Sequence, residues 1–142
     1  MYQPDLETLP RPQLEALQLE RLRTTLRRIQ GNNPKYAARF NGLGADDVRS
    51  LDDVRRFPLI TKEDLRQAYP FGLTCAPQTG FARMHMSSGT TGTPIICPHT
   101  EGDVTQWSEV MARCLTAAGL TRADVLQITP SFGLFNGGFG FH

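Results

Sequence analysis

The first third of the chain carries the hydrophobic spacing of an amphipathic helix. Between Gln13 and Gln30 there is neither glycine nor proline. Leucine and isoleucine recur there at intervals of three and four residues, which places them on one helical face. These positions are Leu19, Leu22, Leu26 and Ile29. The Gly-Asn-Asn-Pro run at residues 31–34 predicts the end of the helix, with proline just past it. A second, short helix is expected over residues 35–40.

Three further helix starts are marked by a Ser/Thr-x-x-Asp pattern. It begins at Ser50, Thr61 and Thr100, and in each case the aspartate three residues later can accept the backbone N–H of the capping residue. We expect Pro70 to close the second of these helices. The third should stop at Gly119 and carries an amphipathic stripe. The stripe consists of Val104, Trp107, Val110, Met111 and Leu115.

The second half of the chain adds short apolar runs that are typical of strands. We expect strands over residues 81–86 and 94–98, on either side of a Ser/Thr/Gly loop, and a buried strand over residues 125–129. Strand, helix and strand in this order predict an α/β layer with a parallel pair. Residues 131–142 hold four glycines and four phenylalanines without a closing element, so the sheet is expected to be incomplete in this chain.

The predicted fold class is therefore α/β, with two regions. Residues 1–76 should form an amino-terminal helical region, and residues 77–142 the first part of an α/β domain that contains the Ser/Thr/Gly loop.

Composition excludes several classes of protein. The chain is 39% hydrophobic and 20% charged with a net charge of +1, whereas a nucleic-acid-binding domain is normally strongly basic. No apolar run approaches the roughly 18 residues of a membrane span, and no signal peptide is visible. Three widely spaced cysteines, Cys75, Cys97 and Cys114, fit reduced and mostly buried thiols of a cytoplasmic protein better than a disulfide frame or a zinc site.

The Ser/Thr/Gly loop has the composition of a phosphate-binding loop. Residues 87–94 read Ser-Ser-Gly-Thr-Thr-Gly-Thr-Pro, with five hydroxyls, two glycines and no acidic side chain. Glycine lets the backbone approach closely, consecutive N–H groups can bind an anion, and hydroxyls add donors. The spacings of a Walker loop and of a dinucleotide fingerprint are both absent. Composition alone leaves an ordinary polar turn equally open.

Several segments resemble motifs of one enzyme superfamily. The Ser-Gly-Thr-Thr-Gly-x-Pro run at residues 88–94 is similar to the signature loop of adenylate-forming enzymes, the acyl-CoA synthetase superfamily. Residues 9–22, 57–73 and 133–142 resemble, in the same order, landmarks of its phenylacetate-CoA ligase branch. Because these landmarks cover nearly the whole chain, the chain is identified as similar to the amino-terminal portion of such a ligase.

The resemblance implies a reaction in two steps. A small aromatic carboxylic acid, phenylacetate in that branch, reacts with ATP to give an acyl-adenylate and pyrophosphate, and coenzyme A then displaces AMP to give a thioester. The loop would hold the ATP phosphates, usually with Mg²⁺, and neutralise charge as pyrophosphate departs. The implied cofactor-binding residues are Ser87, Ser88, Gly89, Thr90, Thr91, Gly92 and Thr93. The family often has lysine at the position of Thr93, so this loop has one cation fewer.

The resemblance also implies where the acid would bind. The segment containing Phe132, Phe135 and Gly137 lines the acyl pocket in that branch, and flanking aromatic rings would suit a phenyl group. Plain core packing is the alternative for the phenylalanines. His142 falls where adenylating enzymes often place a histidine beside the carboxylate. No catalytic residue is assigned within this chain.

Two histidines flank the loop and invite a metal interpretation. His85 and His99 are fourteen residues apart with no third ligand nearby, so we expect residues on a strand face rather than metal ligands.

Two roles remain open at this stage. The chain is a piece of an AMP-forming ligase that is not active alone, because the family's adenine contacts and catalytic lysine lie farther downstream. Alternatively, it is a truncated or degenerate ligase that serves as a non-catalytic interaction or dimerisation module, with a homodimer as a candidate assembly. The expected partners are the aromatic acid, ATP and coenzyme A, with neither nucleic acid nor membrane. The arginines of the first helix are then a solvated face.

Overall fold

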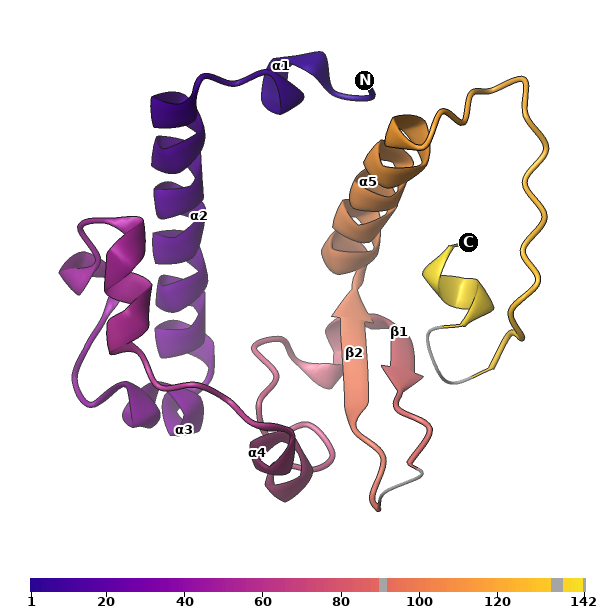
Figure 1. Cartoon of the computed structure of the whole chain (residues 1–142). Coiled ribbons are helices and arrows are strands. Elements are labelled where there is room, and N and C mark those ends of the chain that lie inside the picture. The colour runs from indigo at the N-terminus through magenta and orange to yellow at the C-terminus, as the bar shows by residue number, and fades with distance from the viewer. Residues whose placement is uncertain (90–91, 134–136, 142) are drawn as a thin grey trace. The chain divides into compact units, whose positions relative to one another are not determined.

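The structure is a computed structural model of residues 1–142 and describes all of them except residues 90–91, 134–136 and 142 (Figure 1). The chain divides into two compact units. The helical unit consists of Asp5–Ala68 and Gly72–Cys75, and the hairpin unit of Met1–Pro4, Tyr69–Phe71 and Ala76–His142. Each unit is described by itself.

Helix α2 (Arg11–Asn32) is the long element of the helical unit. Pro10 and Pro12 lie at its start, where the missing N–H of proline costs nothing. Its end is capped by Asn33, whose N–H donates to the Ile29 carbonyl at 2.8 Å. The end of the helix agrees with the sequence prediction. The remaining elements of the first 75 residues are α1 (Pro4–Glu7), α3 (Pro34–Ala37), η1 (Ala38–Phe40), η2 (Ala45–Asp47), η3 (Leu51–Arg56) and α4 (Lys62–Gln67).

A small apolar core holds the helical unit together. Leu26, Phe40, Ala45 and Val48 are buried. The Phe40 ring meets Phe57 edge-on at 5.1 Å between centroids, an arrangement that aromatic pairs favour. The predicted face of α2 is confirmed, because Leu26 is buried and the other three positions pack partly buried against the same core, as do further side chains. The partly buried group is Leu19, Leu22, Ile29, Tyr36, Leu43 and Phe57.

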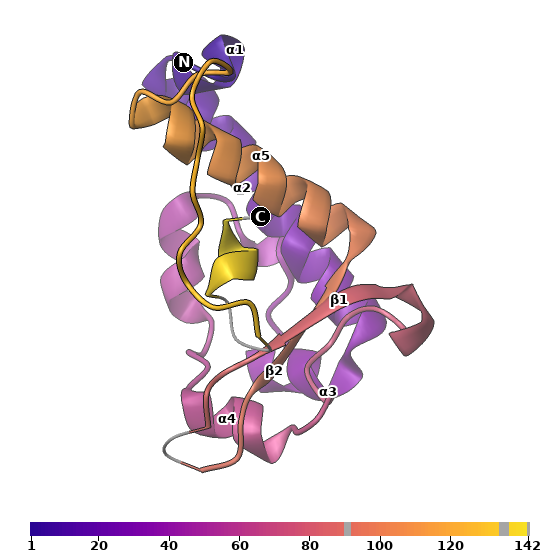
Figure 2. The same cartoon turned by 90° about the vertical axis from the view of Figure 1, so that its right-hand side faces the viewer.

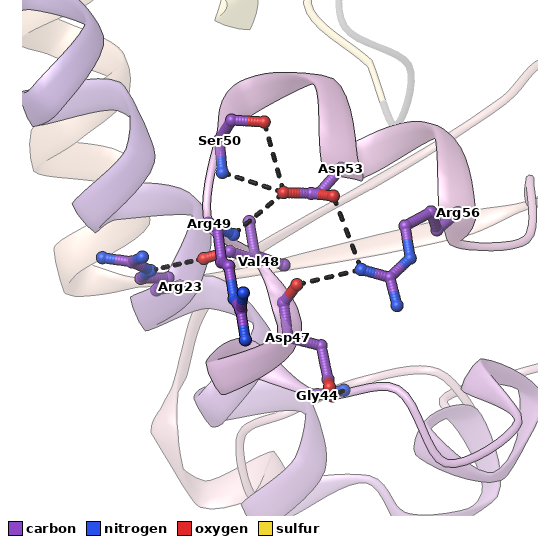
Figure 3. Close-up of polar contacts among 8 residues, drawn as sticks. All are labelled: Arg23, Gly44, Asp47, Val48, Arg49, Ser50, Asp53 and Arg56. Atoms are coloured by element: carbon purple, nitrogen blue, oxygen red, sulfur yellow. Dashed lines mark hydrogen bonds and ion pairs between the residues drawn. The ribbon is translucent and has the colours of Figure 1, made fainter.

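Hydrogen bonds connect the turn between η2 and η3 to α2 and stabilise the start of η3 (Figure 3). Nε of Arg23 on α2 donates to the Val48 carbonyl at 2.8 Å. The Asp53 carboxylate accepts the Ser50 N–H at 2.9 Å, as the capping pattern predicts. Arg56 approaches the other oxygen of Asp53 at 3.4 Å. The backbone donors, that of Ser50 first, lower the pKa of Asp53, because they stabilise its charged form.

A buried asparagine joins the end of α2 to the later segment of the same unit. The side-chain amide of Asn33 donates to the carbonyls of Gly72 and Thr74, both at 3.0 Å. Its Oδ1 accepts the Tyr36 N–H at 2.9 Å. Three hydrogen bonds thus satisfy a side chain that is only 6% exposed, as burial of a polar group requires.

Helix α4 begins at the predicted cap. Thr61 and Asp64 exchange hydrogen bonds in both directions, with the Asp64 carboxylate accepting the Thr61 N–H at 2.7 Å. Arg39 forms an ion pair with Asp64 at 2.8 Å. That guanidinium, together with Thr61, holds the pKa of Asp64 well below its usual range.

The hairpin unit contains the sheet. Strands β1 (Phe81–Met86) and β2 (Ile96–Thr100) pair antiparallel, with Met86 opposite Ile96 and His85 opposite Cys97. Helix α5 (Glu101–Ala117) follows β2 directly and begins at the predicted Thr100 cap. It ends before Gly119, whose φ of 97° suits glycine. Two short helices, η4 (Gln78–Gly80) and η5 (Gly138–Gly140), precede and follow these elements.

The first residues of the chain are tied to α5 of the same unit. Nε2 of Gln3 donates to the Glu109 carboxylate at 2.6 Å, and Tyr2 donates to the same carboxylate at 3.3 Å. Arg113 donates to Oε1 of Gln3. These contacts explain why Met1–Pro4 belong to the hairpin unit although the helical unit follows them in sequence.

Three expectations for the second half are wrong. The parallel pair expected on either side of α5 is not formed within the described residues, where β2 pairs with β1 instead, antiparallel across the short connection of residues 87–95. The second strand covers residues 96–100 instead of 94–98. Residues 125–129 form no strand, and Val125 is 98% exposed. A strand needs a hydrogen-bonded neighbour, and within the described ranges no segment pairs with this one.

Side-chain burial also differs from expectation at several places. Val110 of the predicted stripe is half exposed. All three cysteines are free thiols, but Cys97 and Cys114 are exposed and only Cys75 is partly covered. Two strands and one helix cover too little surface to bury every apolar side chain that they carry. Among the helices that the structure describes, none has the length and apolar character for crossing a membrane.

Candidate functional site

The candidate site is the loop that connects β1 to β2, at the end of the hairpin away from α5 (Figure 2). Its two ends are joined by Ser87 and Ile95. The Ser87 N–H donates to the Ile95 carbonyl at 2.9 Å, and the Ile95 N–H donates to Oγ of Ser87 at 2.9 Å. The Ser87 side chain thus replaces a backbone carbonyl and closes the base of the loop.

Two glycines shape the turn for different reasons. The Gly92 N–H donates to the Gly89 carbonyl at 3.1 Å, which closes a four-residue turn. Gly89 has a φ of 68°, and a Cβ there would lie 2.9 Å from Cγ of Pro94. Gly92 has a φ of 133° with open space around it. A side chain would therefore strain the backbone at both positions, and at Gly89 its Cβ would also come too close to Pro94.

The described part of the loop presents hydroxyls to solvent. Ser88 and Thr93 are exposed and Ser87 is half-buried. Ser87 accepts a hydrogen bond through its oxygen, so its hydroxyl proton can still be donated. Thr90 and Thr91, two of the predicted phosphate contacts, lie outside the described residues. The described part of the loop thus offers two exposed hydroxyls, those of Ser88 and Thr93, and no carboxylate.

The predicted acyl segment forms a local aromatic turn. Phe132 is half exposed and meets Phe139 edge-on at 5.0 Å between centroids. A Cβ on Gly138 would lie 2.8 Å from the Phe132 ring, so this glycine allows the close approach. Gly137 directly precedes η5. Phe135 and His142 fall outside the described residues.

An apolar hollow lies between α5, β1 and η5, with a volume of about 190 Å³. Trp107 and Met111 of α5 line it, Phe139 borders it, and Arg83 of β1 supplies a cation. The guanidinium of Arg83 lies over the Phe139 ring at 5.6 Å, within the range of a cation–π contact. Phe132 and Gly137, the residues predicted from sequence, are not part of its described lining.

The two histidines form part of an aromatic cluster on the sheet face, which confirms their placement on strands. His85 is 3% exposed, and its ring centroid lies 5.5 Å from His99 and 5.4 Å from Trp107. Burial lowers the pKa of His85, as do the charges of His99 and Arg83. Within the described ranges no three His, Cys, Asp or Glu side chains could hold a metal ion together.

Sequence reasoning missed the place of Trp107 beside the histidines and of Arg83 beside the hollow. The signals were present but ambiguous. Strand alternation puts Arg83 and His85 on one face, and Trp107 belongs to the recognised stripe of α5. Only the packing of α5 on the hairpin shows that these two sets of residues meet.

Comparison with solved structures defines the class of protein that the chain resembles. The fold matches crystal structures of 2-hydroxyisobutyryl-CoA ligase. For the complex with 2-HIB-AMP in the post-adenylation state the TM-score is 0.88 at 25% identity, over 97% of this chain and 30% of that chain. For the complex with 2-HIB-AMP and CoA in the thioesterification state the TM-score is 0.88 at 27% identity. That match covers 97% of this chain and 31% of that chain. The fold is that of the amino-terminal part of an adenylate-forming CoA ligase, which confirms the predicted fold class.

Comparison with curated proteins narrows the resemblance to the phenylacetate-coenzyme A ligases. The protein of that name from Escherichia coli (strain K12) is 42% identical over 139 residues, which are 96% of this chain and 32% of the relative. The one from Thermus thermophilus is 44% identical over 144 residues, a match that covers 100% of this chain and 32% of the relative. No family model matches the chain. The predicted resemblance is confirmed, and the chain spans about a third of the length of these relatives.

Proposed function

We propose that the chain supplies the phosphate-binding hairpin of an AMP-forming aryl-acid CoA ligase. In the complete reaction, a small aromatic acid such as phenylacetate attacks the α-phosphate of ATP, which gives an acyl-adenylate and releases pyrophosphate. The thiol of coenzyme A then displaces AMP and forms the thioester. The observation that carries the proposal is the loop glycine Gly89, where a side chain would be strained and would meet Pro94, in a chain similar over its length to phenylacetate-coenzyme A ligases.

The loop's contribution would be electrostatic. In this proposal the hydroxyls of Ser87, Ser88 and Thr93 would donate to phosphate oxygens, as would Thr90, Thr91 and the backbone N–H of Gly89. Such donors neutralise charge that develops as pyrophosphate leaves. Residues 87–94 carry no carboxylate, so Mg²⁺ would be held by the phosphates of the nucleotide instead of by ligands in the loop. Gly92 contributes shape, because its N–H already donates within the turn.

The acid would lie against the turn that contains Phe132, Phe135 and Gly137. The edge-on packing of Phe132 on Phe139 leaves half of Phe132 exposed, and an exposed aromatic face suits a phenyl group. These three residues would form one wall of the acyl pocket.

This chain is not expected to complete the reaction alone, since it spans about a third of the length of the relatives. We propose a cytoplasmic location as well, because three free thiols suit a reducing compartment. The boundary between the helical region and the adenylation domain is proposed to fall at residue 76. A homodimer stays a candidate assembly that sedimentation of the purified chain would test.

The phosphate-binding role can be tested with inorganic pyrophosphate as the probe. Titration calorimetry of the purified chain should show binding, and Gly89→Ala should weaken it by about tenfold or more, because a positive φ costs roughly 1–2 kcal/mol for a residue with a side chain and the Cβ meets Pro94. Gly119→Ala is the matched control. Gly119 has a φ of 97° and open space around it, far from the loop in sequence.

Two results would contradict the proposal. If the unaltered chain binds no pyrophosphate, the loop is an ordinary polar turn. If Gly119→Ala weakens binding as much as Gly89→Ala, the effect reports general destabilisation of the hairpin unit. Incubation with phenylacetate, ATP and coenzyme A should give no thioester, and any turnover would show that the chain is catalytically sufficient.

A further inference from the structure

His85 occupies a special position in the hairpin unit. It is the penultimate residue of β1, two residues before Ser87, and its imidazole is 3% exposed. Three rings from three other elements surround it. They are His99 of β2 at 5.5 Å, Trp107 of α5 at 5.4 Å and Phe139 of η5 at 6.0 Å between centroids.

Packing, and not hydrogen bonding, holds this imidazole within the described part of the chain. Neither Nδ1 nor Nε2 of His85 has a hydrogen-bond partner there, although both atoms are buried. Burial without a partner disfavours a charged ring far more than a neutral one. The charged groups that act on it are of like sign, Arg83 on its own strand and His99 on β2, and α5 and η5 face it with the rings of Trp107 and Phe139.

Ser87 lies close to this ring along the chain. β1 ends at Met86, so Ser87 is the first residue past the strand and the second residue after His85. Ser87 makes both hydrogen bonds that join the two ends of the loop, through its N–H and through Oγ. Because only Met86 separates the two residues, a change in how the His85 ring packs against Trp107 of α5 would move the strand end that precedes Ser87.

We propose that His85 is a positioning residue of the phosphate loop, whose neutral imidazole, packed against His99 and Trp107, holds the Ser87–Ile95 pair in place. The part of this proposal that concerns ligand binding rests on the proposed function of the loop. The part that concerns the Ser87–Ile95 pair does not, because it is a property of the protein without ligand.

The test compares three versions of the full chain by amide hydrogen exchange in NMR spectra. They are the unaltered protein, His85→Ala, which removes the ring, and His85→Phe, which keeps a ring of similar size that cannot be protonated. The quantity measured is the protection of the Ile95 amide relative to amides inside α5, such as that of Met111. Pyrophosphate affinity is measured on the same samples by calorimetry.

At about pH 8 we expect His85→Ala to lower the relative protection of Ile95 and the pyrophosphate affinity by about tenfold, a change of 1.4 kcal/mol, while His85→Phe retains most of both. Between about pH 8 and pH 5.5 the relative protection should fall in the unaltered protein and stay level in His85→Phe. At each pH the pyrophosphate affinity of the unaltered protein is divided by that of His85→Phe, so that the ionisation of pyrophosphate itself cancels. If His85 served core packing alone, its loss would lower the protection of the Ile95 and Met111 amides together. There would then be no pH dependence specific to the imidazole.

Several outcomes would overturn the proposal. One is that His85→Ala leaves the protection of the Ile95 amide unchanged. Another is that His85→Ala lowers the protection of the Met111 amide by as much as that of Ile95. A third is pH dependence that persists in His85→Phe but disappears in His99→Phe, since His99 would then be the titrating group. Pyrophosphate affinity that rises as the imidazole is protonated would indicate direct attraction between the ring and the phosphates. Absence of pyrophosphate binding in every version would refute the proposed function, and the amide measurements would still decide the positioning role.

Discussion

The two units of this chain differ in how their residues are held. The helical unit has a core of aliphatic and aromatic side chains, with Leu26, Phe40 and Val48 buried, and side-chain hydrogen bonds fasten its turns. In the hairpin unit the described buried side chains are those of Ile95 and His85, whereas Val125 is almost fully exposed. The unit with the poorer core carries the candidate site. The loop of the candidate site is thus formed where burial is sparse, and aromatic packing takes the place of an aliphatic core in this unit.

The largest expected effect tests whether the two units are independent. Phe40→Ala should destabilise the helical unit by about 3–5 kcal/mol, because it removes a buried ring and leaves a cavity. Urea unfolding followed through the Leu26 amide in NMR spectra measures this, while fluorescence of Trp107, the single tryptophan, reports on the hairpin unit. Val125→Ala is the control, since that side chain is 98% exposed. An equal shift of both signals in Phe40→Ala would show that the units unfold together.

A smaller but still clear effect is expected at the end of α2. Asn33→Ala removes three hydrogen bonds and leaves the carbonyls of Gly72 and Thr74 without this donor, which should cost about 1–3 kcal/mol. Asn32→Ala is the matched neighbour, because exposed Asn32 donates to the Arg28 carbonyl of its own helix. Thermal unfolding by circular dichroism gives both values. Similar melting temperatures for the two variants would mean that the buried contacts contribute little.

Acid should affect the two units in different pH ranges. The pKa of His85 is lowered from 6.5 in the folded chain, so the unfolded state binds more protons and hairpin stability falls as the pH drops below about 6.5. The pKa of Asp64 is lowered from 3.8, so its contribution is present above that pH and is lost only below it. Trp107 fluorescence should therefore change at a higher pH than the NMR signal of the Leu26 amide in α2. His85→Phe should remove the earlier change, and coincident transitions in the unaltered chain would argue against this assignment.

The smallest effect is expected at an exposed ion pair of α2. Arg11 and Glu15 lie 2.6 Å apart with side chains 73% and 48% exposed. Exposed pairs of this kind contribute little, so Glu15→Gln should change the free energy of unfolding by less than about 0.5 kcal/mol. Urea titrations at low and high salt measure it. A loss above about 1 kcal/mol that salt abolishes would show that this surface pair matters more to the helical unit than exposed pairs normally do.

Much of the fold follows from short stretches of sequence. The leucine spacing of α2, the proline after Asn33 and the caps at Thr61 and Thr100 each place an element boundary that the structure reproduces. β1 matches its expected range. These features depend on neighbours three or four residues away, so the sequence itself contains the interacting groups. The assigned phosphate and acyl contacts stay predictions, with Thr90, Thr91 and Phe135 outside the described residues.

The sequence alone determined the helices, their caps, the family resemblance and the glycines of the loop, because each depends on residues close together in the chain. Tertiary structure decided the antiparallel pairing, the exposure of residues 125–129, the contacts of Asn33 and the cluster of His85 with Trp107. These depend on groups that lie far apart in sequence, and hydrophobic periodicity gives the face of an element without giving its partner. For that reason the loop could be recognised from its amino-acid sequence, whereas the contact of His85 with Trp107 is visible only in the tertiary structure.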